Sequence, residues 1–388
     1  MVVDSPAGAL LQLTVIGVHT ACEAYPNTLY SLRGLRRDFD VIEINVPLLP
    51  QEGGAMRARG GLLRNAWRIV STHVRVVVKG LLMRPRPWRA FVPYPAPILL
   101  CIWSFVPRGL RPRRVVADAF ISLYDTVVND RGLLQPTDWR AKLLWRIERR
   151  AYGVAAAVIV DTPQNADFYA SLFRLPRDLF VPVPLATNER DFALTPPPIR
   201  RSTCNVLFIG TLIPLHGIST IVDAARLLAG RHDIRFTIIG TGQEASVMES
   251  ALNDGMVNIT WERDWKTSAQ LAAHITQANI CLGIFGPGPK TQRVCPYKVY
   301  AYASMGRPVI TARTAWLDQA AKEFGGMPFV DVPAADASAL AAGIVRLADD
   351  EALCGEMANH ARKFYDDMLA NRVTFARLRA NITGETGS

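Results

Sequence analysis

Three cationic side chains lie close together in the second half of the chain, directly after an apolar segment that is typical of a buried strand. Lys290 and Arg293 lie in the glycine- and proline-rich stretch GIFGPGPKTQRVCP, and Lys298 stands at the start of the helical pattern that follows. Arginine can hold a phosphate through two parallel hydrogen bonds, and lysine acts on it as a point charge. The spacing therefore predicts a phosphate or diphosphate site, although one or two of these charges would also suit a solvated loop.

A second anion-binding feature precedes them at residues 206–228, VLFIGTLIPLHGISTIVDAARLL. An apolar run ends in a turn, and apolar residues then recur at helical spacing. The turn contains four residues that we assign to the site: Gly210, Thr211, His216 and Gly217. A strand, a glycine-bearing turn and a helix point backbone N–H groups and a helix N-terminus at one place, which suits a diphosphate. An ordinary turn of a doubly wound domain explains this stretch equally well.

Further candidate ligand-binding positions follow the next two predicted strands. Gly240 and Gly242 form a similar turn after one of them. Trp261 ends the other and would line a ligand pocket, with core packing as the simpler explanation. His216 would donate a hydrogen bond to the bound anion; if it acts as a cation, its charge is lost within the physiological pH range. A neutral loop histidine explains it equally well.

Two carboxylates in the first half follow a strand predicted at Arg114–Ala117. Asp118 and Asp125 lie in the segment DAFISLYDT, at or just beyond the strand's carboxyl end, where open α/β sheets place ligands. We predict that they contact a hydroxyl group of a ligand. Capping a helix is the commoner role for such an aspartate. His19, after the first strand, is a weaker candidate of the same kind.

The elements that would position these residues form two α/β domains. At 388 residues the chain is long enough for two domains of about 150–200 residues each. Strands are predicted at Leu11–Val18, Val41–Val46, Phe91–Tyr94, Arg114–Ala117, Ala157–Val160, Phe180–Val183, Val206–Ile209, Arg235–Gly240, Ile259–Trp261, Ile280–Gly283 and Pro308–Thr311, with helical patterns between them. LTPPPI (Leu194–Ile199) is typical of a linker. We predict domains at 1–195 and 196–365, followed by a C-terminal helical segment, 366–388.

The positive charge of the chain is concentrated between Glu52 and Asp118. The formal net charge is +10, and this window contains no acidic residue. Its cations are Arg57, Arg59, Arg64, Arg68, Arg75, Lys79, Arg84, Arg86, Arg89, Arg108, Arg111, Arg113 and Arg114. A helical stripe runs beside them: Leu62, Leu63, Trp67, Val70, Val74, Val78 and Leu81. Apolar and basic faces on one helix favour an anionic membrane surface, so we predict this partner for residues 57–114. A core helix with a solvated basic face is the alternative.

The cysteines and the apolar segments bear on the compartment and on other possible partners. The six cysteines show no paired metal-ligand spacing, which favours a reduced, cytosolic protein without a structural zinc. We expect no secretory signal, because the N-terminus lacks a basic region followed by an apolar run of signal length. We also expect no transmembrane helix, because the most apolar segment, FVPYPAPILLCIWSFV, is interrupted by prolines and is too short to span a bilayer. We expect no nucleic acid as partner, since the basic window alternates with Leu, Val and Trp rather than forming a stacking platform.

The motifs in the second half resemble a known family. GTLIPLHG before a helix, IIGTG, QANICLGIF and PYKVYAYASMGRPVIT occur in this order and resemble the C-terminal half of GT-B glycosyltransferases of the family 4 type. YPN, DAFISLYDT and VIVDT in the first half resemble bacterial members that build surface polysaccharides. The resemblance implies two Rossmann-like, doubly wound domains facing a central cleft. It also implies a nucleotide-sugar donor on the C-terminal domain, an acceptor on the N-terminal domain, and no metal or other cofactor. The last helix of such proteins returns to the first domain, which implies that Asn371–Asn381 does so here.

The sequence departs from the family pattern at the donor site. Thr211 and His216 occupy the positions of an arginine and a lysine that hold the diphosphate in many members. Arg293 and Ala301 occupy those of two glutamates, the second of which holds the ribose. Lys298 lies between them, as in members that read P-N-K. We therefore hypothesise that Lys290, Arg293 and Lys298 supply the missing cationic charge. For the implied reaction, His216 would donate to the diphosphate or to the donor sugar and Trp261 would line the base pocket. Asp118 and Asp125 would contact the acceptor hydroxyl or the donor sugar.

These inferences predict a retaining, metal-independent glycosyltransferase. It would move a sugar from a nucleotide-sugar donor to a lipid-linked or polysaccharide acceptor. We expect a cytoplasmic enzyme, peripheral on the inner face of the cell membrane. No nucleophile is evident in the sequence, so departure and attack on the same face of the sugar is the favoured route. A nucleotide-sugar epimerase and a degenerate glycan- or lipid-binding relative are the alternatives.

Overall fold

The computed structural model describes residues 10–46, 62–83, 87–198 and 203–385 of the chain. The described residues divide into two units: those within 1–186 and 372–388 form unit 1, and those within 187–371 form unit 2. The predicted linker Leu194–Ile199 lies inside unit 2, and the chain passes between the units at Ala186–Thr187 and again at Asn371–Arg372.

Unit 1 is built on a parallel sheet with the strand order β2-β1-β3-β4-β5-β6. Its strands are β1 (Leu11–Gly17), β2 (Phe39–Asn45), β3 (Arg89–Val92), β4 (Arg114–Asp118), β5 (Ala157–Val160) and β6 (Phe180–Pro182). Its helices are α1 (Pro26–Asp38), α2 (Leu62–Leu82), α3 (Pro97–Trp103), α4 (Trp139–Tyr152), α5 (Pro163–Phe173) and α13 (Asn371–Thr383), with shorter turns η1 (Arg108–Leu110), η2 (Asp125–Asp130) and η3 (Arg177–Leu179). The residues of β5 are buried throughout, as expected for a central strand covered on both faces.

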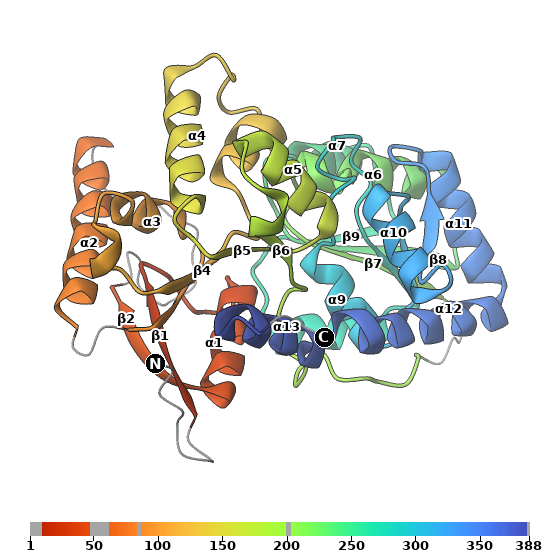
Figure 1. The fold of residues 1–388 in the computed structure, drawn as a ribbon. Helices are drawn as coiled ribbons and strands as arrows, with labels where there is room; N and C mark the ends of the chain where they lie inside the picture. Colours follow the sequence, from red (N-terminus) through yellow and green to blue (C-terminus); the bar gives the residue numbers. More distant parts are fainter. Residues whose placement is uncertain (1–9, 47–61, 84–86, 199–202, 386–388) are drawn as a thin grey trace. The chain divides into compact units, whose positions relative to one another are not determined.

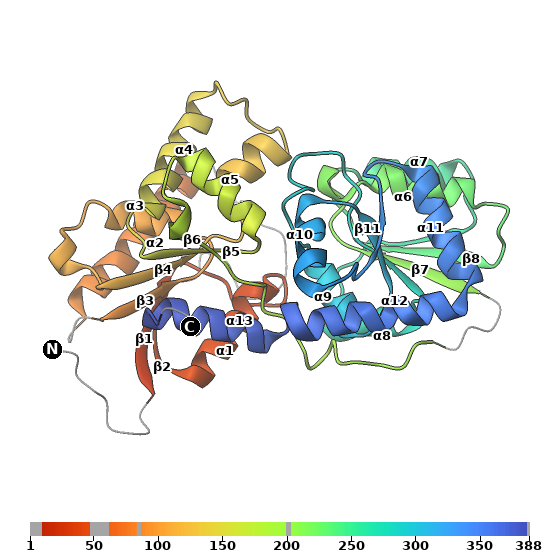
Figure 2. The same cartoon turned by 45° about the vertical axis from the view of Figure 1, so that its right-hand side comes forward.

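The C-terminal helix α13 packs within unit 1, beside α1 in both ribbon views (Figures 1 and 2). Leu378 and Ile382 are buried in the core on this side of the sheet. Gly34 of α1 permits the close approach, because a Cβ there would lie 2.2 Å from a ring carbon of Phe375. Arg114 adds a hydrogen bond of 2.7 Å from Nε to the carbonyl of Asn381.

Unit 2 has a parallel sheet in the order β12-β11-β10-β7-β8-β9. Its strands are β7 (Cys204–Ile209), β8 (Ile234–Ile239), β9 (Ile259–Glu262), β10 (Ile280–Leu282), β11 (Val309–Ala312) and β12 (Val330–Val332). Its helices are α6 (Ile218–Leu227), α7 (Ala245–Asn253), α8 (Ser268–Gln277), α9 (Tyr297–Ser304), α10 (Ala315–Phe324), α11 (Ala337–Asp349) and α12 (Glu351–Phe364), with η4 (Pro214–His216) and the π-helical η5 (Tyr365–Leu369). The sequence patterns did not reveal β12 or α10.

The strand order of unit 2 reverses between β7 and β10, which are hydrogen-bonded neighbours. Open α/β sheets bind ligands beyond the carboxyl ends of the strands at such a switch point. The loops that leave these two strands carry both predicted anion-binding stretches, 210–217 and 283–296. The fold therefore brings together segments that lie about 80 residues apart in the sequence.

Candidate functional site in unit 2

A cavity of about 240 Å³ lies beyond the carboxyl end of β7. The residues lining it are Phe192, Ile209, Gly210, Thr211, His216, Leu271, Ile275, Pro296, Tyr297, Lys298, Ala301 and Tyr302. Four of the predicted site residues are thus brought to one place: Gly210, Thr211, His216 and Lys298. All the lining residues belong to unit 2.

Lys298 is the basic side chain that lines this cavity. It stands in the first turn of α9, is only 8% exposed, and its Nζ lies 3.7 Å from the ring centroid of Phe208 and 3.5 Å from the carbonyl of Gly283. No carboxylate in the described ranges pairs with it, and burial lowers the pKa of its ammonium well below the usual range. A buried ammonium without a counter-ion is costly, and an anionic ligand would offset that cost.

Gly210 makes room for this charge. Its φ of +156° is a conformation that favours glycine, and a Cβ there would lie 2.8 Å from the Nζ of Lys298 and 3.1 Å from Cε1 of His216. Any side chain at this position would displace both groups. The end of β7 is therefore shaped so that Lys298 and His216 lie directly over the backbone.

His216 is neutral in this setting. It is buried, and its Nδ1 is hydrogen-bonded to the carbonyl of Thr211. Burial, and then the charge of Lys298, lower the pKa of the His216 imidazole well below its usual range. A cationic role for His216 near neutral pH therefore finds no support in its surroundings. A neutral imidazole can still donate or accept one hydrogen bond at Nε2.

The remaining glycines of the predicted site serve the packing of the loops. A Cβ on Gly240 would lie 2.1 Å from the carbonyl oxygen of Gly210, and one on Gly242 would lie 2.5 Å from that of Leu212. Gly217, the N-cap of α6, faces the backbone of Phe285 in the same way, at 2.6 Å. These three glycines hold neighbouring loops at the sheet edge in contact, and none of them lines the cavity.

The other predicted donor-binding residues lie outside the cavity lining. Lys290 does not line the cavity, although its charge contributes to the lowered pKa of His216. Arg293 is buried. Trp261 packs partly on the unit 2 core, donates from Nε1 to the carbonyl of Gly240 at 2.8 Å and is covered by Arg263. Their roles in donor binding stay predictions.

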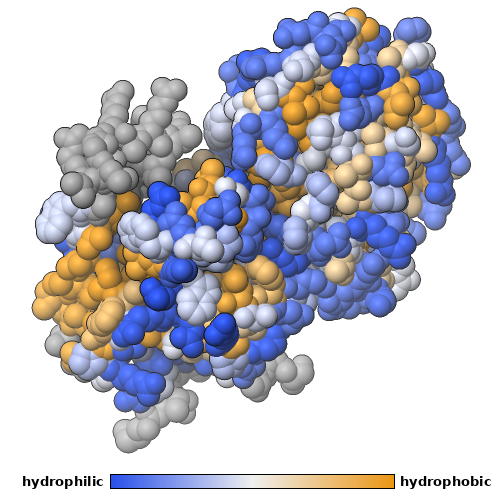
Figure 3. Space-filling view, turned by 90° about the horizontal axis from the view of Figure 1, so that it is seen from above, coloured by the Kyte–Doolittle hydropathy of each residue, from blue (hydrophilic) through white to orange (hydrophobic). Residues whose placement is uncertain are grey.

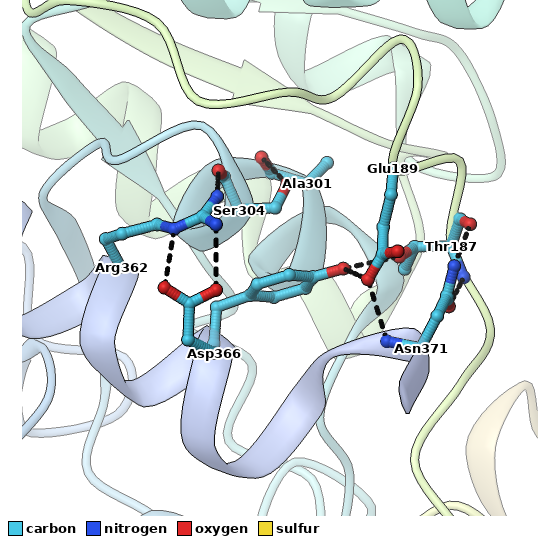
Figure 4. Close-up of polar contacts among 8 residues, drawn as sticks. Thr187, Glu189, Ala301, Ser304, Arg362, Asp366 and Asn371 are labelled. Atoms are coloured by element: carbon cyan, nitrogen blue, oxygen red, sulfur yellow. Dashed lines mark hydrogen bonds and ion pairs between the residues drawn. The ribbon is translucent and has the colours of Figure 1, made fainter. Parts of the chain in front are cut away.

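Helix α9 is tied to its neighbours through its C-terminal half. Tyr302 accepts a hydrogen bond of 2.9 Å from the backbone N–H of Ile209, which ties α9 to β7. At the C-terminal end, the guanidinium of Arg362 donates to the carbonyl of Ser304 and pairs with Asp366 at 2.8 Å (Figure 4). A cation at the last carbonyls of a helix also complements its dipole. Lys298 and Ala301 are thus presented by a fixed support.

Asp118 and Asp125 lie in unit 1 and are both buried. Asp118 accepts hydrogen bonds from the N–H of Phe120 at 3.2 Å and from Asn27 at 3.4 Å, and burial raises the pKa of its carboxyl to about 7. Asp125 begins the π-helical turn η2 and accepts from Asn129 at 3.0 Å. Both carboxylates hold the loop after β4, and their assignment to the acceptor or sugar stays a prediction.

His19 is also buried and is paired within unit 1. Its Nε2 lies 3.1 Å from Oε1 of Glu43 on β2, and Asn45 accepts from its backbone N–H at 3.2 Å. Hydrogen bonds from His19 and then Arg36 lower the pKa of Glu43 to about 2. The pairing fixes the turn after β1 to the neighbouring strand.

Glu148 is a buried carboxylate that was not among the residues predicted from the sequence. It lies on α4 and accepts from the hydroxyl of Ser122 at 2.7 Å and from the N–H groups of Leu123 and Tyr124 at 2.8 and 3.0 Å. Burial raises the pKa of Glu148, and it organises the segment that carries Asp125. A signal existed, because Glu148 falls on the buried face of its helix, three residues before Ala151.

Comparison with known families finds a match within unit 2. Residues 203–350 match the family described as "Glycosyl transferases group 1". A comparison of the sequence with curated proteins finds no significant match.

Solved structures share the fold over nearly the whole chain. Sucrose-phosphate synthase from Thermosynechococcus elongatus aligns with a TM-score of 0.68 at 16% identity, covering 97% of this chain and 100% of that one. WaaG, a glycosyltransferase involved in lipopolysaccharide biosynthesis, aligns at 0.67 and 14% identity with the same coverage. HepE from Anabaena, in complex with UDP-glucose, aligns at 0.68 and 11% identity, again with 97% and 100% covered. The predicted two-domain fold is confirmed by these matches together with the two parallel sheets.

Proposed function

We propose that this chain is a glycosyltransferase that transfers a sugar from a nucleotide-sugar donor bound in unit 2, with retention of configuration and without a metal. The match of residues 203–350 to the group 1 family and the fold shared with solved glycosyltransferase structures support this proposal. The observation that carries the proposal is the buried, carboxylate-free ammonium of Lys298 over Gly210. The structure of HepE in complex with UDP-glucose supports a donor of this class.

The proposed reaction needs stabilisation of a leaving diphosphate. The bond between the anomeric carbon and the β-phosphate oxygen breaks, and the acceptor oxygen bonds to the same carbon on the same face. The acceptor proton passes to the departing phosphate oxygen. Lys298 and the first-turn N–H groups of α9 stabilise the charge that builds on the phosphate oxygens, with Lys290 as a further cation. In the described ranges, no three side chains of the His, Cys, Asp and Glu types group as metal ligands do.

We also propose that α2 places the enzyme on an anionic membrane, at the cytoplasmic face where lipid-linked or polysaccharide acceptors would be used. His73, Val76 and Val77 are buried. A second apolar stripe on the same helix is exposed: Trp67 (73%), Val70, Val74, Val78 and Leu82 (71%). The described residues leave this stripe exposed to solvent.

The cations of α2 complement this stripe. Arg68, Arg75 and Lys79 are exposed and fall on one flank of it at helical spacing. Phe105, after α3, adds a further exposed ring beneath Arg150, whose guanidinium lies 4.1 Å from the ring centroid. Figure 3 shows an apolar patch on the left of the molecule, the side on which Figure 1 draws α2 and α3. Arg57, Arg59, Arg84 and Arg86 lie outside the described residues. No described helix is both long and apolar enough to cross a bilayer.

Donor use is tested by assaying nucleotide release and sugar transfer with a panel of nucleotide sugars and membrane-lipid extract. The proposal expects donor-dependent transfer in the wild type and its loss in Lys298→Met. Donor turnover that is undiminished in this variant would contradict the assignment of the site.

Membrane attachment is tested by co-sedimentation with vesicles of phosphatidylglycerol and of phosphatidylcholine. The variant Trp67→Ser/Val74→Ser should lose binding to the anionic vesicles, and Arg75→Glu should weaken it by about 1 kcal/mol or more. The matched control Leu227→Ser/Val257→Ser removes two exposed apolar side chains of unit 2 and should bind as the wild type does. Equal binding by all variants would rule out α2 as the docking element.

A further inference from the structure

We infer that an arginine cluster at one edge of unit 1 binds the phosphate group of an anionic lipid. The inference rests on the membrane attachment proposed above and names the lipid group that is recognised. The arginine cluster consists of Arg108 and Arg111, in the segment that follows α3, and Arg150 in the last turn of α4. These residues belong to unit 1, whereas all the residues that line the donor cavity belong to unit 2.

Ser104 brings two of the guanidiniums together. Arg111 donates from Nη2 to the carbonyl of Ser104 at 3.0 Å and from Nε to that of Val106 at 2.6 Å. Arg150 donates from Nε to the hydroxyl of Ser104 at 2.6 Å, and this hydroxyl donates in turn to the carbonyl of Cys101 at 2.6 Å. These bonds hold both side chains in place. The Nη1 group of Arg111 and both Nη groups of Arg150 make no hydrogen bond within the described parts of the chain.

The charge of the arginine cluster is not neutralised by the residues that the structure describes. None of its three members forms an ion pair with a carboxylate among them. Burial, and then the positive charges of Arg108 and Arg150, lower the pKa of the Arg111 guanidinium. Like charges that lie close together repel one another, and an anion among them offsets that repulsion. The unused N–H groups can hold phosphate oxygens through charge-assisted hydrogen bonds.

Exposed aromatic rings at the same edge of the sheet favour a lipid over a free phosphate ion. Phe105 is 71% exposed, and the guanidinium of Arg150 lies 4.1 Å from its ring centroid. Trp88, directly before β3, is also exposed, and the guanidinium of Arg113 lies 4.2 Å from its ring centroid. Such rings are favoured at the boundary between lipid headgroups and acyl chains. A free phosphate ion would make no use of them.

The arginine cluster lies where the exposed stripe of α2 ends. Helix α3 packs against both α2 and α4, and Figure 1 draws it between them. Each of these three helices joins one strand to a later parallel strand, so each ends at the amino edge of the sheet. Leu82 at the end of the stripe, Phe105 and the arginine cluster therefore lie at one edge, which allows a single membrane surface to contact all of them.

A soluble short-chain lipid tests for a discrete site. Isothermal titration of the full-length protein uses dihexanoyl phosphatidylglycerol below its micelle concentration, with inorganic phosphate and dihexanoyl phosphatidylcholine as comparisons. The inference expects saturable binding of the phosphatidylglycerol and weaker binding of the other two. Phe105→Ser should weaken binding of the lipid and leave that of phosphate unchanged. Phosphate that binds as tightly as the lipid would overturn the choice of a lipid as the ligand.

A pair of double variants tests the arginine cluster itself. Arg108→Gln/Arg150→Gln removes two charges and keeps Arg111, which holds the segment after α3. An arginine near an anionic surface contributes about fivefold in affinity, so this variant should bind the phosphatidylglycerol weaker by about fivefold or more. The matched control Arg37→Gln/Arg379→Gln removes two exposed arginines of α1 and α13 and should bind as the wild type does. Thermal melts check that both variants fold.

Three further results would overturn the inference. Equal binding by the two double variants would exclude the arginine cluster. Binding to anionic vesicles without saturable binding of the soluble lipid would mean that diffuse charge alone attracts the membrane. Polythymidylate that binds the cluster more tightly than the lipid would mean that it serves a nucleic acid. The proposal for α2 fails separately: if Trp67→Ser/Val74→Ser still sediments with anionic vesicles and the soluble lipid still binds, α2 is refuted and the lipid site stands.

Discussion

Replacing Lys298 by methionine should stabilise the free protein and weaken nucleotide binding at the same time. In the free protein the ammonium is buried against Phe208 and lacks a carboxylate partner among the described residues. A buried polar group that lacks a good partner costs about 1–3 kcal/mol, and an apolar side chain of similar length removes that cost. For a unit the size of unit 2, each kcal/mol raises the melting temperature by about 2–4 °C.

The ligand-bound state should respond in the opposite direction. A hydrogen bond between a charged donor and a phosphate oxygen contributes about 1.5–3 kcal/mol, so Lys298→Met should weaken binding of the preferred nucleoside diphosphate by about 10- to 150-fold. The stabilisation that a ligand confers falls with its affinity. Thermal melts with and without nucleotide should therefore cross: the variant melts higher when free, and the wild type gains more on adding ligand.

The pH dependence follows from the lowered pKa of Lys298. Between that depressed value and about 10.4, the unfolded chain binds the Lys298 proton and the folded protein does not, so wild-type unfolding free energy should rise with pH across this window. Lys298→Met removes that rise. Binding a diphosphate favours the protonated amine, so wild-type binding should take up a proton and weaken as pH increases. Calorimetry in buffers of different ionisation enthalpy measures the uptake.

The control for this series is Lys322→Met, which removes an exposed lysine of α10. It should change the free energy of unfolding by no more than about 0.5 kcal/mol and leave the nucleotide affinity unchanged. A destabilised Lys298→Met protein with wild-type nucleotide affinity would refute the reasoning, because the ammonium would then be a structural group and not a ligand-binding one.

Three other predictions concern buried polar groups. The pKa of Asp118 is raised to about 7, so between about pH 4 and 7 its carboxyl is protonated in the folded state and ionised in the unfolded state. The free energy of unfolding of the wild type should therefore fall as the pH rises through this range. Urea titrations should show that Asp118→Asn lacks this fall. Glu148→Ala leaves several buried hydrogen-bond donors without an acceptor and should lower the free energy of unfolding by about 3 kcal/mol. Denaturant unfolding monitored by tryptophan fluorescence measures this loss. Asn371→Ala removes both side-chain bonds to the backbone of Thr187, at 2.8 and 2.9 Å, and should speed hydrogen exchange there, whereas unchanged exchange would contradict the contact (Figure 4).

The local elements followed from the sequence because their signals are short-range. Buried parallel strands such as β5 and β7 are continuous apolar runs, and Pro26 marks the first turn of α1. The order of motifs predicted the glycosyltransferase fold that the comparisons confirm. The elements β12 and α10 were not predicted, because they are short and their periodicity is weak.

The role of each charge was decided by the tertiary structure. Composition placed Lys290, Arg293 and Lys298 on one loop and helix start, but burial over Gly210 distinguishes Lys298 as the ammonium that lines the cavity. In the same way, burial makes His216 neutral. Asp118 and Asp125 are buried by the fold and held in hydrogen-bonded networks. Residue type and spacing determine what a side chain can do. Its protonation and partners depend on solvent exclusion by segments distant in the chain, which a linear pattern does not record.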